Sequence, residues 1–332
     1  MRQGHNPQKR NESSTQPPEA ITVAVLIYIP EEKGYYEKAF DTFRLCLASI
    51  RENADQPFDL LVLDNGSCDK VRTYLKQELS EGRIDILISN FRNVGKLNAV
   101  FQMLWSAPGE YVFFTDGDIY YKPGWMNAHL DIINTYPKVG IVGGVPLRNQ
   151  AHDFTKGTIQ WVEENKLELL VEDGDIIPEA WTREYLRSVD QEQFIDTWIN
   201  FGDRKITYKG VTAFVGASHM QYLIRREVLE SIKRFRSDKT ISKDNDLVID
   251  DYLESNGYLR LSAEKPYVYH IGNSLSEAWL VDEFVRLVQE VPVLNKNSSK
   301  AQKYHWLWSR WKVRLVVMGI YEWAFKLLYE YK

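Results

Sequence analysis

A regular alternation of apolar runs and helical segments over residues 21–145 most constrains the fold of this 332-residue sequence. Residues 21–29 form a continuous apolar run, typical of a strand buried on both faces. Apolar residues then recur at steps of four and three through residues 36–50, which predicts a helix packed on a sheet. The same logic predicts strands at 58–63, 84–88, 111–115 and 139–145 and helices at 71–79, 95–105 and 124–136. Such alternation predicts an α/β fold with a mostly parallel, doubly wound sheet.

The second half of the sequence is less regular. Residues 146–210 are rich in acidic and aromatic side chains without a clear period. We interpret them as a lid or acceptor-binding insertion, with an ordinary surface excursion as the alternative. Beyond them we expect strands at 211–215, 258–261 and 267–270 and helices at 227–235 and 247–255.

Composition narrows the class of protein. The net charge of −5 argues against a basic nucleic-acid-binding surface, so we expect no nucleic-acid partner. The two cysteines, Cys46 and Cys68, make neither a disulfide framework nor a zinc site, which favours a reducing compartment. Residues 1–20 are polar, lack the apolar core of a signal peptide, and are expected to be disordered. We therefore predict a cytoplasmic protein.

The end of the chain is unusual. Residues 305–332 contain four tryptophans, with Arg310, Lys312 and Arg314 among them. We predict that residues 276–332 form a helical, aromatic-rich extension. Tryptophan beside cationic residues is typical of an interfacial anchor, here on the cytoplasmic membrane face. Packing against the rest of the chain, or a homodimer contact, is the alternative.

Two carboxylates stand at the end of one predicted strand. Asp116 and Asp118 follow the run 111–115, with Gly117 between them. Neighbouring carboxylates repel each other, and a divalent cation with hard oxygen ligands, Mg²⁺ or Mn²⁺, removes that repulsion. Such a metal usually shares its coordination shell with a substrate phosphate. A solvated acidic turn is the alternative.

Further polar groups occur at other element boundaries. Asp64-Asn65-Gly66-Ser67 follows the strand at 58–63, and Asn93-Val94-Gly95-Lys96 opens a helix whose N-terminus suits a phosphate. Asp244, Asp246, Asp250 and Asp251 cluster near another helix start, where an ionised carboxylate is a candidate general base. His270 ends a strand and is a candidate metal ligand. A plain turn, helix caps and a core histidine are the respective alternatives.

In this order and at these spacings, the motifs resemble those of the family 2 glycosyltransferases with the GT-A fold. The resemblance implies a GT-A domain at 21–275, with 146–210 inserted near the acceptor. It implies that the following residues bind a nucleotide sugar: Tyr28, Ile29, Asp64, Asn93, Lys96, Asp116 and Gly117. It implies Mn²⁺ or Mg²⁺ on Asp118 and His270, with Asp116 as a further ligand directly or through water. It implies Asp246 as the catalytic base, with Asp250 and Asp251 left open as alternatives.

The activity implied is inverting transfer of a sugar from a UDP or GDP sugar to a hydroxyl of a glycan or lipid-linked acceptor, in surface glycan or polysaccharide synthesis. The sequence departs from the family pattern in three places. Tyr28-Ile29-Pro30-Glu31 replaces Pro-Thr-Tyr-Asn, Asn245 replaces the Glu before the base, and no Gln-x-x-Arg-Trp follows near His270, which argues for single transfers. One rival, a sugar nucleotidyltransferase, requires a Gly-rich first loop that residues 28–33 do not provide. Another, a non-catalytic glycan-binding scaffold, predicts a missing ligand or base.

Overall fold

A computed structural model describes residues 16–148, 154–237 and 248–289 of the chain. The chain divides into two compact units, Met1–Val288 and Gln289–Lys332, and only the first is described below. Three predicted features lie outside the described residues: the base Asp246, residues 1–15 of the predicted disordered segment 1–20, and the Trp-rich segment 305–332.

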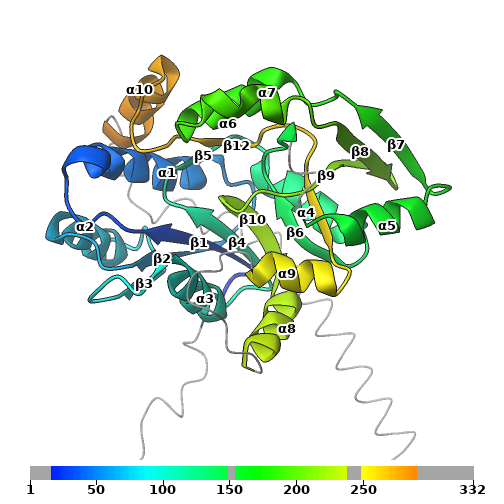
Figure 1. Cartoon of the computed structure of the whole chain (residues 1–332). Helices are drawn as coiled ribbons and strands as arrows, with labels where there is room; N and C mark the ends of the chain where they lie inside the picture. The colour runs from blue at the N-terminus through cyan, green and yellow to red at the C-terminus, as the bar shows by residue number, and fades with distance from the viewer. Residues whose placement is uncertain (1–15, 149–153, 238–247, 290–332) are drawn as a thin grey trace, which may run out of the picture. The chain divides into compact units, whose positions relative to one another are not determined.

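The first half of this unit alternates strands and helices as predicted (Figure 1). In chain order the elements are β1 (Ile21–Ile27), a 3₁₀ turn (Gly34–Tyr36), α1 (Ala39–Asn53), β2 (Asp59–Asp64), α2 (Asp69–Ser80), β3 (Ile86–Ser89), α3 (Lys96–Ser106), β4 (Tyr111–Asp116), β5 (Ile119–Tyr121), α4 (Trp125–Thr135) and β6 (Val139–Gly143).

The second half begins with elements in the segment that shows no period in the sequence. They are α5 (Lys156–Glu164), β7 (Leu169–Gly174), α6 (Glu179–Ser188), a 3₁₀ turn (Glu192–Phe194), α7 (Ile195–Trp198) and β8 (Asp203–Tyr208). Then follow β9 (Val211–Val215), β10 (Gln221–Arg225), α8 (Arg226–Ser237), α9 (Val248–Ser255), β11 (Leu259–Ala263), β12 (Val268–His270), α10 (Ala278–Phe284) and a π-helical turn (Val285–Gln289).

Ten strands form the main sheet, in the order β3-β2-β1-β4-β10-β6-β11-β9-β8-β7. The pairings show that β3, β2, β1, β4, β6, β11 and β8 run in one direction and β10, β9 and β7 in the other. The predicted α/β fold with a mostly parallel sheet is therefore confirmed. β10, a five-residue strand inserted antiparallel between β4 and β6, was not predicted from the sequence.

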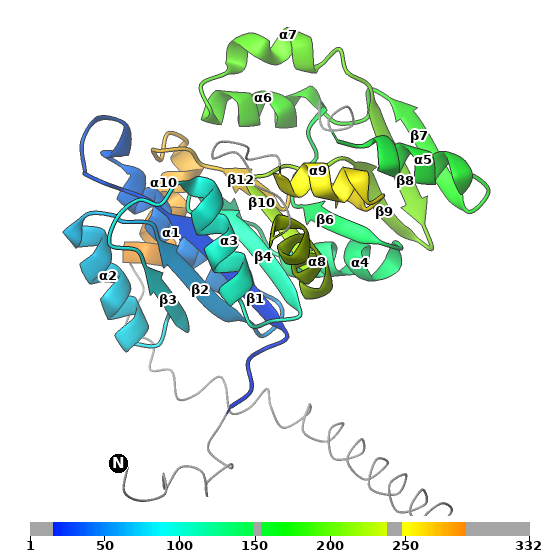
Figure 2. The same cartoon turned by 60° about the horizontal axis from the view of Figure 1, so that its bottom comes forward.

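Helices cover both faces of the sheet because its central strands are apolar on both sides. In β1, Val23 and Val25 belong to the apolar cluster that includes residues of α1, α2, α4 and α5, whereas Ala24 and Leu26 belong to the cluster on the opposite face, which includes residues of α3, α8 and α9. This is the two-residue alternation of a strand buried on both faces. Figure 2 shows α3 and α8 on the near face of the sheet. Because helices cover both faces of the sheet, polar ligand-binding groups are expected at the ends of its strands.

A second, two-stranded sheet lies beyond the end of β4. β12 pairs antiparallel with β5, with His270 opposite Ile119 and Tyr269 opposite Tyr120. α10 covers this ribbon by burying Leu280 and Phe284 against it and α1. A strand late in the chain is thus brought to the two carboxylates at the end of β4.

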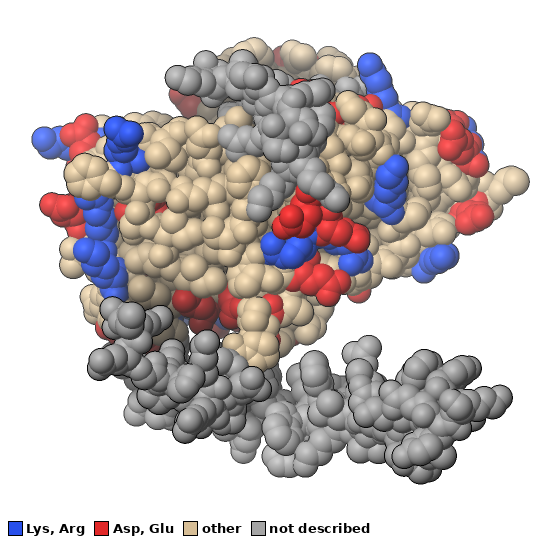
Figure 3. Space-filling model, turned by 90° about the horizontal axis from the view of Figure 1, so that it is seen from below, with Lys and Arg blue, Asp and Glu red and all other residues tan. Residues whose placement is uncertain are grey.

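Charge is mixed on the surface shown in Figure 3, where basic side chains stand beside acidic ones and acidic residues gather near the centre of the view. Among the described residues, no helix is both long enough and apolar enough to cross a bilayer.

Candidate active site

The site is built at the carboxyl end of β4, where parallel sheets bind ligands. Asp116 is the last residue of β4, and the chain leaves the sheet through Gly117. A Cβ at Gly117 would lie 3.0 Å from both the Leu26 carbonyl oxygen and a Phe43 ring carbon, so the backbone packs closely there. This tight exit directs Asp116 and Asp118 to the same edge of the sheet.

Asp118 and His270, the metal ligands implied by the family resemblance, lie next to each other across the β5–β12 ribbon. The His270 Nε2 and an Asp118 carboxylate oxygen are 3.4 Å apart, and the Ile271 N–H donates to the Asp118 carbonyl at 2.8 Å. The other Asp118 carboxylate oxygen is buried without a hydrogen-bond partner.

Two residues of α6 fix the other side of the His270 ring. Ser188 Oγ lies 2.8 Å from His270 Nδ1, and the Tyr185 ring packs edge-on at a centroid distance of 5.8 Å. A metal-ligating histidine usually has its second ring nitrogen held in this way. No sequence signal pointed to Ser188 or Tyr185, because the segment around them shows no period.

The charges around His270 change its protonation. Burial alone lowers the pKa of His270, but the hydrogen bond and charge of Asp118 and the charge of Asp116 together raise it above its usual value. The imidazole therefore lies in a region of negative electrostatic potential, which also suits a bound cation.

Asp116 faces Lys96, the first residue of α3. The Lys96 ammonium nitrogen lies 2.9 Å from an Asp116 carboxylate oxygen, and the Asp116 N–H donates to the Met220 carbonyl at 3.0 Å. Burial and the charge of Asp118 raise the pKa of Asp116, while Lys96 opposes the shift. Lys96 is half-exposed, with 52% of its side chain accessible, so it can also reach an anionic ligand.

The turn after β2 is a rigid network of amide and carboxylate groups. Asp64 accepts a hydrogen bond from the Ser67 N–H at 2.7 Å, and its second oxygen lies 3.7 Å from Arg72 Nε. Asn65 donates to the Asn93 side chain at 3.0 Å and accepts from the Val94 N–H at 3.1 Å. The structure therefore joins the two predicted nucleotide-binding turns into one surface.

The end of β1 supports this surface. Ile29 is buried, its N–H donates to Ser67 Oγ at 3.0 Å, and its carbonyl accepts from the Cys68 N–H at 2.8 Å. Tyr28 is half-buried, and its ring packs edge-on against Tyr36. In the described structure Ile29 holds the turn in place, and Tyr28 lies beside it.

The two described candidates for the base differ sharply. Asp250 is fully buried, 2.8 Å from Arg260 and 3.2 Å from the His219 Nδ1, and burial raises its pKa against the effect of those partners. Asp251 is exposed on α9. Asp250 is thus part of a buried ion pair, and Asp251 is a surface carboxylate.

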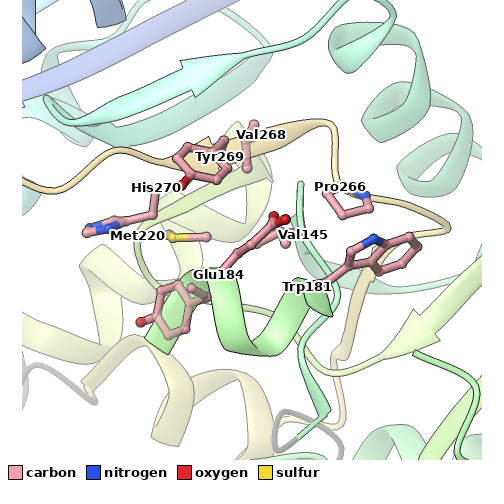
Figure 4. Close-up of a pocket in the computed structure, with 9 residues that line it drawn as sticks. Val145, Trp181, Glu184, Met220, Pro266, Val268, Tyr269 and His270 are labelled. Atoms are coloured by element: carbon pink, nitrogen blue, oxygen red, sulfur yellow. The ribbon is translucent and has the colours of Figure 1, made fainter. Parts of the chain in front are cut away.

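A small cavity of about 20 Å³ lies between α6 and β12, enough for about one water. Figure 4 shows Trp181 and Glu184 on its α6 side and Tyr269 and His270 on its β12 side. Glu184 and Tyr269 also line a larger hollow of about 310 Å³, whose other walls are Lys122, Arg187, Glu277 and Trp279. That volume is at the lower end of ligand pockets.

The residues that meet at the edge of β4 also fall within a known family model. The model for glycosyl transferase family 2 matches residues 35–233, which include Asp64, Lys96, Asp116 and Asp118. The chain belongs to glycosyl transferase family 2. The predicted family and GT-A fold are thereby confirmed.

Two solved structures are similar to this family 2 chain. One is the mannosyltransferase PcManGT from Pyrobaculum calidifontis in complex with GDP-Man and Mn²⁺, at 24% identity, a TM-score of 0.30, and coverage of 40% of this chain and 36% of that one. The other is S. aureus TarS 1–349, at 14% identity, a TM-score of 0.36, and coverage of 75% and 59%. The chain spans less than two thirds of either. No curated protein matches it.

The described residues fit a metal held partly by substrate. Within residues 16–148, 154–237 and 248–289, no group of three or more His, Cys, Asp or Glu side chains is arranged to hold an ion. Asp118 and His270 would therefore supply two ligands, and phosphate and water the remainder, which is the usual arrangement for Mg²⁺ with a phosphorylated substrate. The unpartnered Asp118 oxygen fits such a cation.

Proposed function

We propose that this chain is a metal-dependent inverting glycosyltransferase that moves a sugar from a nucleoside-diphosphate sugar to a hydroxyl acceptor. The observation that supports this most is the pairing of Asp118 with His270 at 3.4 Å beside the Asp116–Lys96 pair at 2.9 Å. The two pairs place carboxylate metal ligands and the Lys96 ammonium group at the same edge of the sheet. A metal-bound diphosphate needs both the metal ligands and such a counter-charge.

In this proposal the nucleotide lies over the joined turns. Asp64 faces the base, UDP and GDP remaining the two candidates for the nucleotide, and Asn93 and Gly117 lie beside the ribose and phosphates. Gly95, the residue before α3, has a φ of 84°, a backbone conformation that favours glycine. Lys96 then serves as a counter-charge to the diphosphate, and Asp116 positions it.

Asp118 and His270 would hold Mn²⁺ or Mg²⁺, with Asp116 contributing directly or through water. The ion would supply positive charge to the leaving diphosphate. Ser188 keeps the Nε2 of His270 turned toward Asp118 by binding Nδ1. The proposed base, Asp246, takes the proton of the attacking hydroxyl, which approaches the anomeric carbon opposite the diphosphate and inverts it.

The acceptor is proposed to bind beneath residues 146–210. The 310 Å³ hollow supports this, because α6 from that segment forms one wall and Trp279 and Tyr269 offer aromatic surface. Its lining combines two basic with two acidic side chains, which suits a neutral polyhydroxyl ligand such as a glycan. We further propose that the reaction serves surface glycan or polysaccharide synthesis at the cytoplasmic membrane face.

A donor screen tests the proposal. The purified chain is incubated with UDP and GDP sugars, with Mn²⁺, with Mg²⁺ or with EDTA, and released nucleoside diphosphate is measured. We expect one donor to be hydrolysed slowly in the presence of metal. A parallel incubation supplies a nucleoside triphosphate and a sugar phosphate, and release of pyrophosphate there would instead identify a nucleotidyltransferase.

A further inference from the structure

One residue of the larger hollow combines an exposed aromatic ring with a fixed position. Trp279 lies in the first turn of α10, and 37% of it is exposed. It lines the hollow of about 310 Å³ together with Glu184 and Tyr269, and these two residues also line the small cavity beside His270. The hollow therefore adjoins the candidate metal site.

Two tyrosines of the two-stranded sheet hold the Trp279 ring. Tyr120 of β5 and Tyr269 of β12 lie opposite each other in the register, so their side chains stand on one face of the ribbon. The Trp279 ring packs at nearly right angles to both, with centroid distances of 5.2 Å to Tyr120 and 5.1 Å to Tyr269. The Tyr120 hydroxyl in turn donates to Glu283 of α10 at 2.7 Å. The indole is thus held in place before a ligand binds, which lowers the entropic cost of binding.

Charged side chains of both signs line the hollow around this ring. Burial lowers the pKa of the half-buried Lys122, and the charge of Glu184 opposes the shift. Burial and the charges of Glu277 and Glu184 raise the pKa of Tyr269 to about 12. An ammonium group donates hydrogen bonds and a carboxylate accepts them, whereas a sugar hydroxyl does both. A neutral sugar therefore matches this lining without adding an unbalanced charge.

We propose that Trp279 stacks against a sugar unit of the acceptor and so makes α10 part of the acceptor site. The apolar C–H face of a pyranose ring fits the negative face of an aromatic ring, while its hydroxyls reach the charged side chains around it. This inference rests on the proposed function, in which the hollow holds the acceptor. α10 lies beyond residues 35–233, so this surface belongs to the part of the chain outside the match to the family model.

The test uses the full chain with fluorotryptophan in place of tryptophan and follows the fluorine resonances by NMR. The resonance that is missing from Trp279→Phe identifies Trp279. The neutral probes are methyl β-D-glucopyranoside, methyl β-D-galactopyranoside, methyl α-D-mannopyranoside and N-acetylglucosamine, and the anionic comparisons are glucuronic acid and inorganic phosphate.

Saturation-transfer NMR of each sugar gives its affinity for the wild type and for three variants. Trp279→Ala removes the ring, and Trp279→Phe keeps a smaller one. Phe194→Ala is the matched control, because Phe194 is also an exposed aromatic residue but does not line the hollow. Thermal melting shows whether each variant folds, and the fluorine shift in the wild type does not depend on Trp279→Ala.

We expect at least one neutral sugar to shift the Trp279 resonance, and glucuronic acid and phosphate to leave it unchanged. Trp279→Ala should weaken binding of that sugar roughly tenfold or more, and Trp279→Phe roughly twofold to threefold, because the smaller ring offers less surface for stacking. Phe194→Ala should bind the sugar as the wild type does.

Three results would overturn the proposal for Trp279: no shift with any neutral sugar, a shift with the anionic probes alone, or wild-type affinity in Trp279→Ala. Binding of GDP and UDP with Mn²⁺ is measured in the same proteins. A wild-type chain that binds neither diphosphate would overturn the proposed function itself, whereas diphosphate binding without sugar binding confines the failure to Trp279.

Discussion

At the residue scale, two neighbouring carboxylates of α9 have opposite surroundings. Asp250 is fully buried against Arg260, whereas Asp251 is exposed. The sequence could not separate them, because both lie near a helix start where capping and catalysis use the same residue type. In the structure Asp250 is one half of a buried ion pair with Arg260, and Asp246 stays the predicted base.

The base assignment predicts three different results. Asp246→Asn should lower the transfer rate by roughly 10² to 10⁴ with donor binding nearly unchanged. Asp251→Asn is the matched surface control and should behave as the wild type. Asp250→Asn should lower the free energy of unfolding by about 3–5 kcal/mol, since it leaves Arg260 buried without its charge partner. Single-turnover rates and urea unfolding measure these effects, and a large rate loss confined to Asp251→Asn would show that the base is misassigned.

A buried histidine predicts pH-dependent stability. His129 is fully buried, and burial lowers its pKa from 6.5 to about 4. The folded state therefore resists protonation that the unfolded state accepts, so stability is complete above about pH 6.5 and is lost as the pH falls toward 4. Between pH 7.5 and 5 the loss should be about 2 kcal/mol.

Urea unfolding of the wild type and His129→Gln at both pH values measures this contribution. The variant should be less stable at pH 7.5 but should lose about 2 kcal/mol less than the wild type on acidification. The same acid-induced loss in both proteins would assign the effect to other groups.

At the element scale, the turn after β2 depends on one glycine. Gly66 has a φ of 89°, and a Cβ there would lie 2.7 Å from the backbone of Arg92 and Asn93. Gly210, in the β8–β9 turn, has a similar φ of 83° with nothing within 4 Å. Gly210→Ala should cost about 1–2 kcal/mol for the left-handed backbone, and Gly66→Ala about 1–3 kcal/mol more for the clash. Urea unfolding compares the stability of the two variants. An equal loss in the free energy of unfolding would mean that the backbone at residues 92–93 moves aside without cost.

The sequence predicted the strands and helices of the first half well, because each central strand is apolar and each helix has a clear period. The family resemblance implied Asp118 and His270 as metal ligands, and in the structure their side chains lie 3.4 Å apart; metal binding by this pair stays a prediction. The sequence did not predict β10, which begins with the polar Gln221 and ends with the basic Arg225. It also missed the contacts of Ser188 and Tyr185 with His270, because they depend on how α6 lies against β12. Those contacts are determined by tertiary packing and leave no local pattern in the sequence.

At the scale of the whole molecule, α10 belongs to the core. Leu280 and Phe284 are buried against Leu45 and Tyr120. Ending the chain after Asn273 should therefore lower stability by several kcal/mol, about 2–5 for each large side chain lost. Ending it after Gln289 keeps α10 and should preserve the thermal transition. Calorimetry of both truncations checks this, and a stable protein ending at Asn273 would show that α10 is dispensable.

The proposed membrane contact of residues 305–332 is tested with the longer truncation. The full chain should bind anionic vesicles less tightly as salt rises, because surface attraction is screened over about a Debye length. The protein ending at Gln289 should not sediment with vesicles. If this protein aggregates instead, residues 290–332 cover part of the molecule or a homodimer contact.

The central claim is that Asp118 and His270 bind the metal that holds a nucleoside diphosphate. The most direct measurement is calorimetry of diphosphate binding with Mn²⁺ and with EDTA, in the wild type and in Asp118→Asn, which should fold because Asp118 lies beyond the strand end. We predict Mn²⁺-dependent binding in the wild type, its loss in EDTA, and its loss in Asp118→Asn at an unchanged melting temperature. Equal affinity in all three conditions would contradict it.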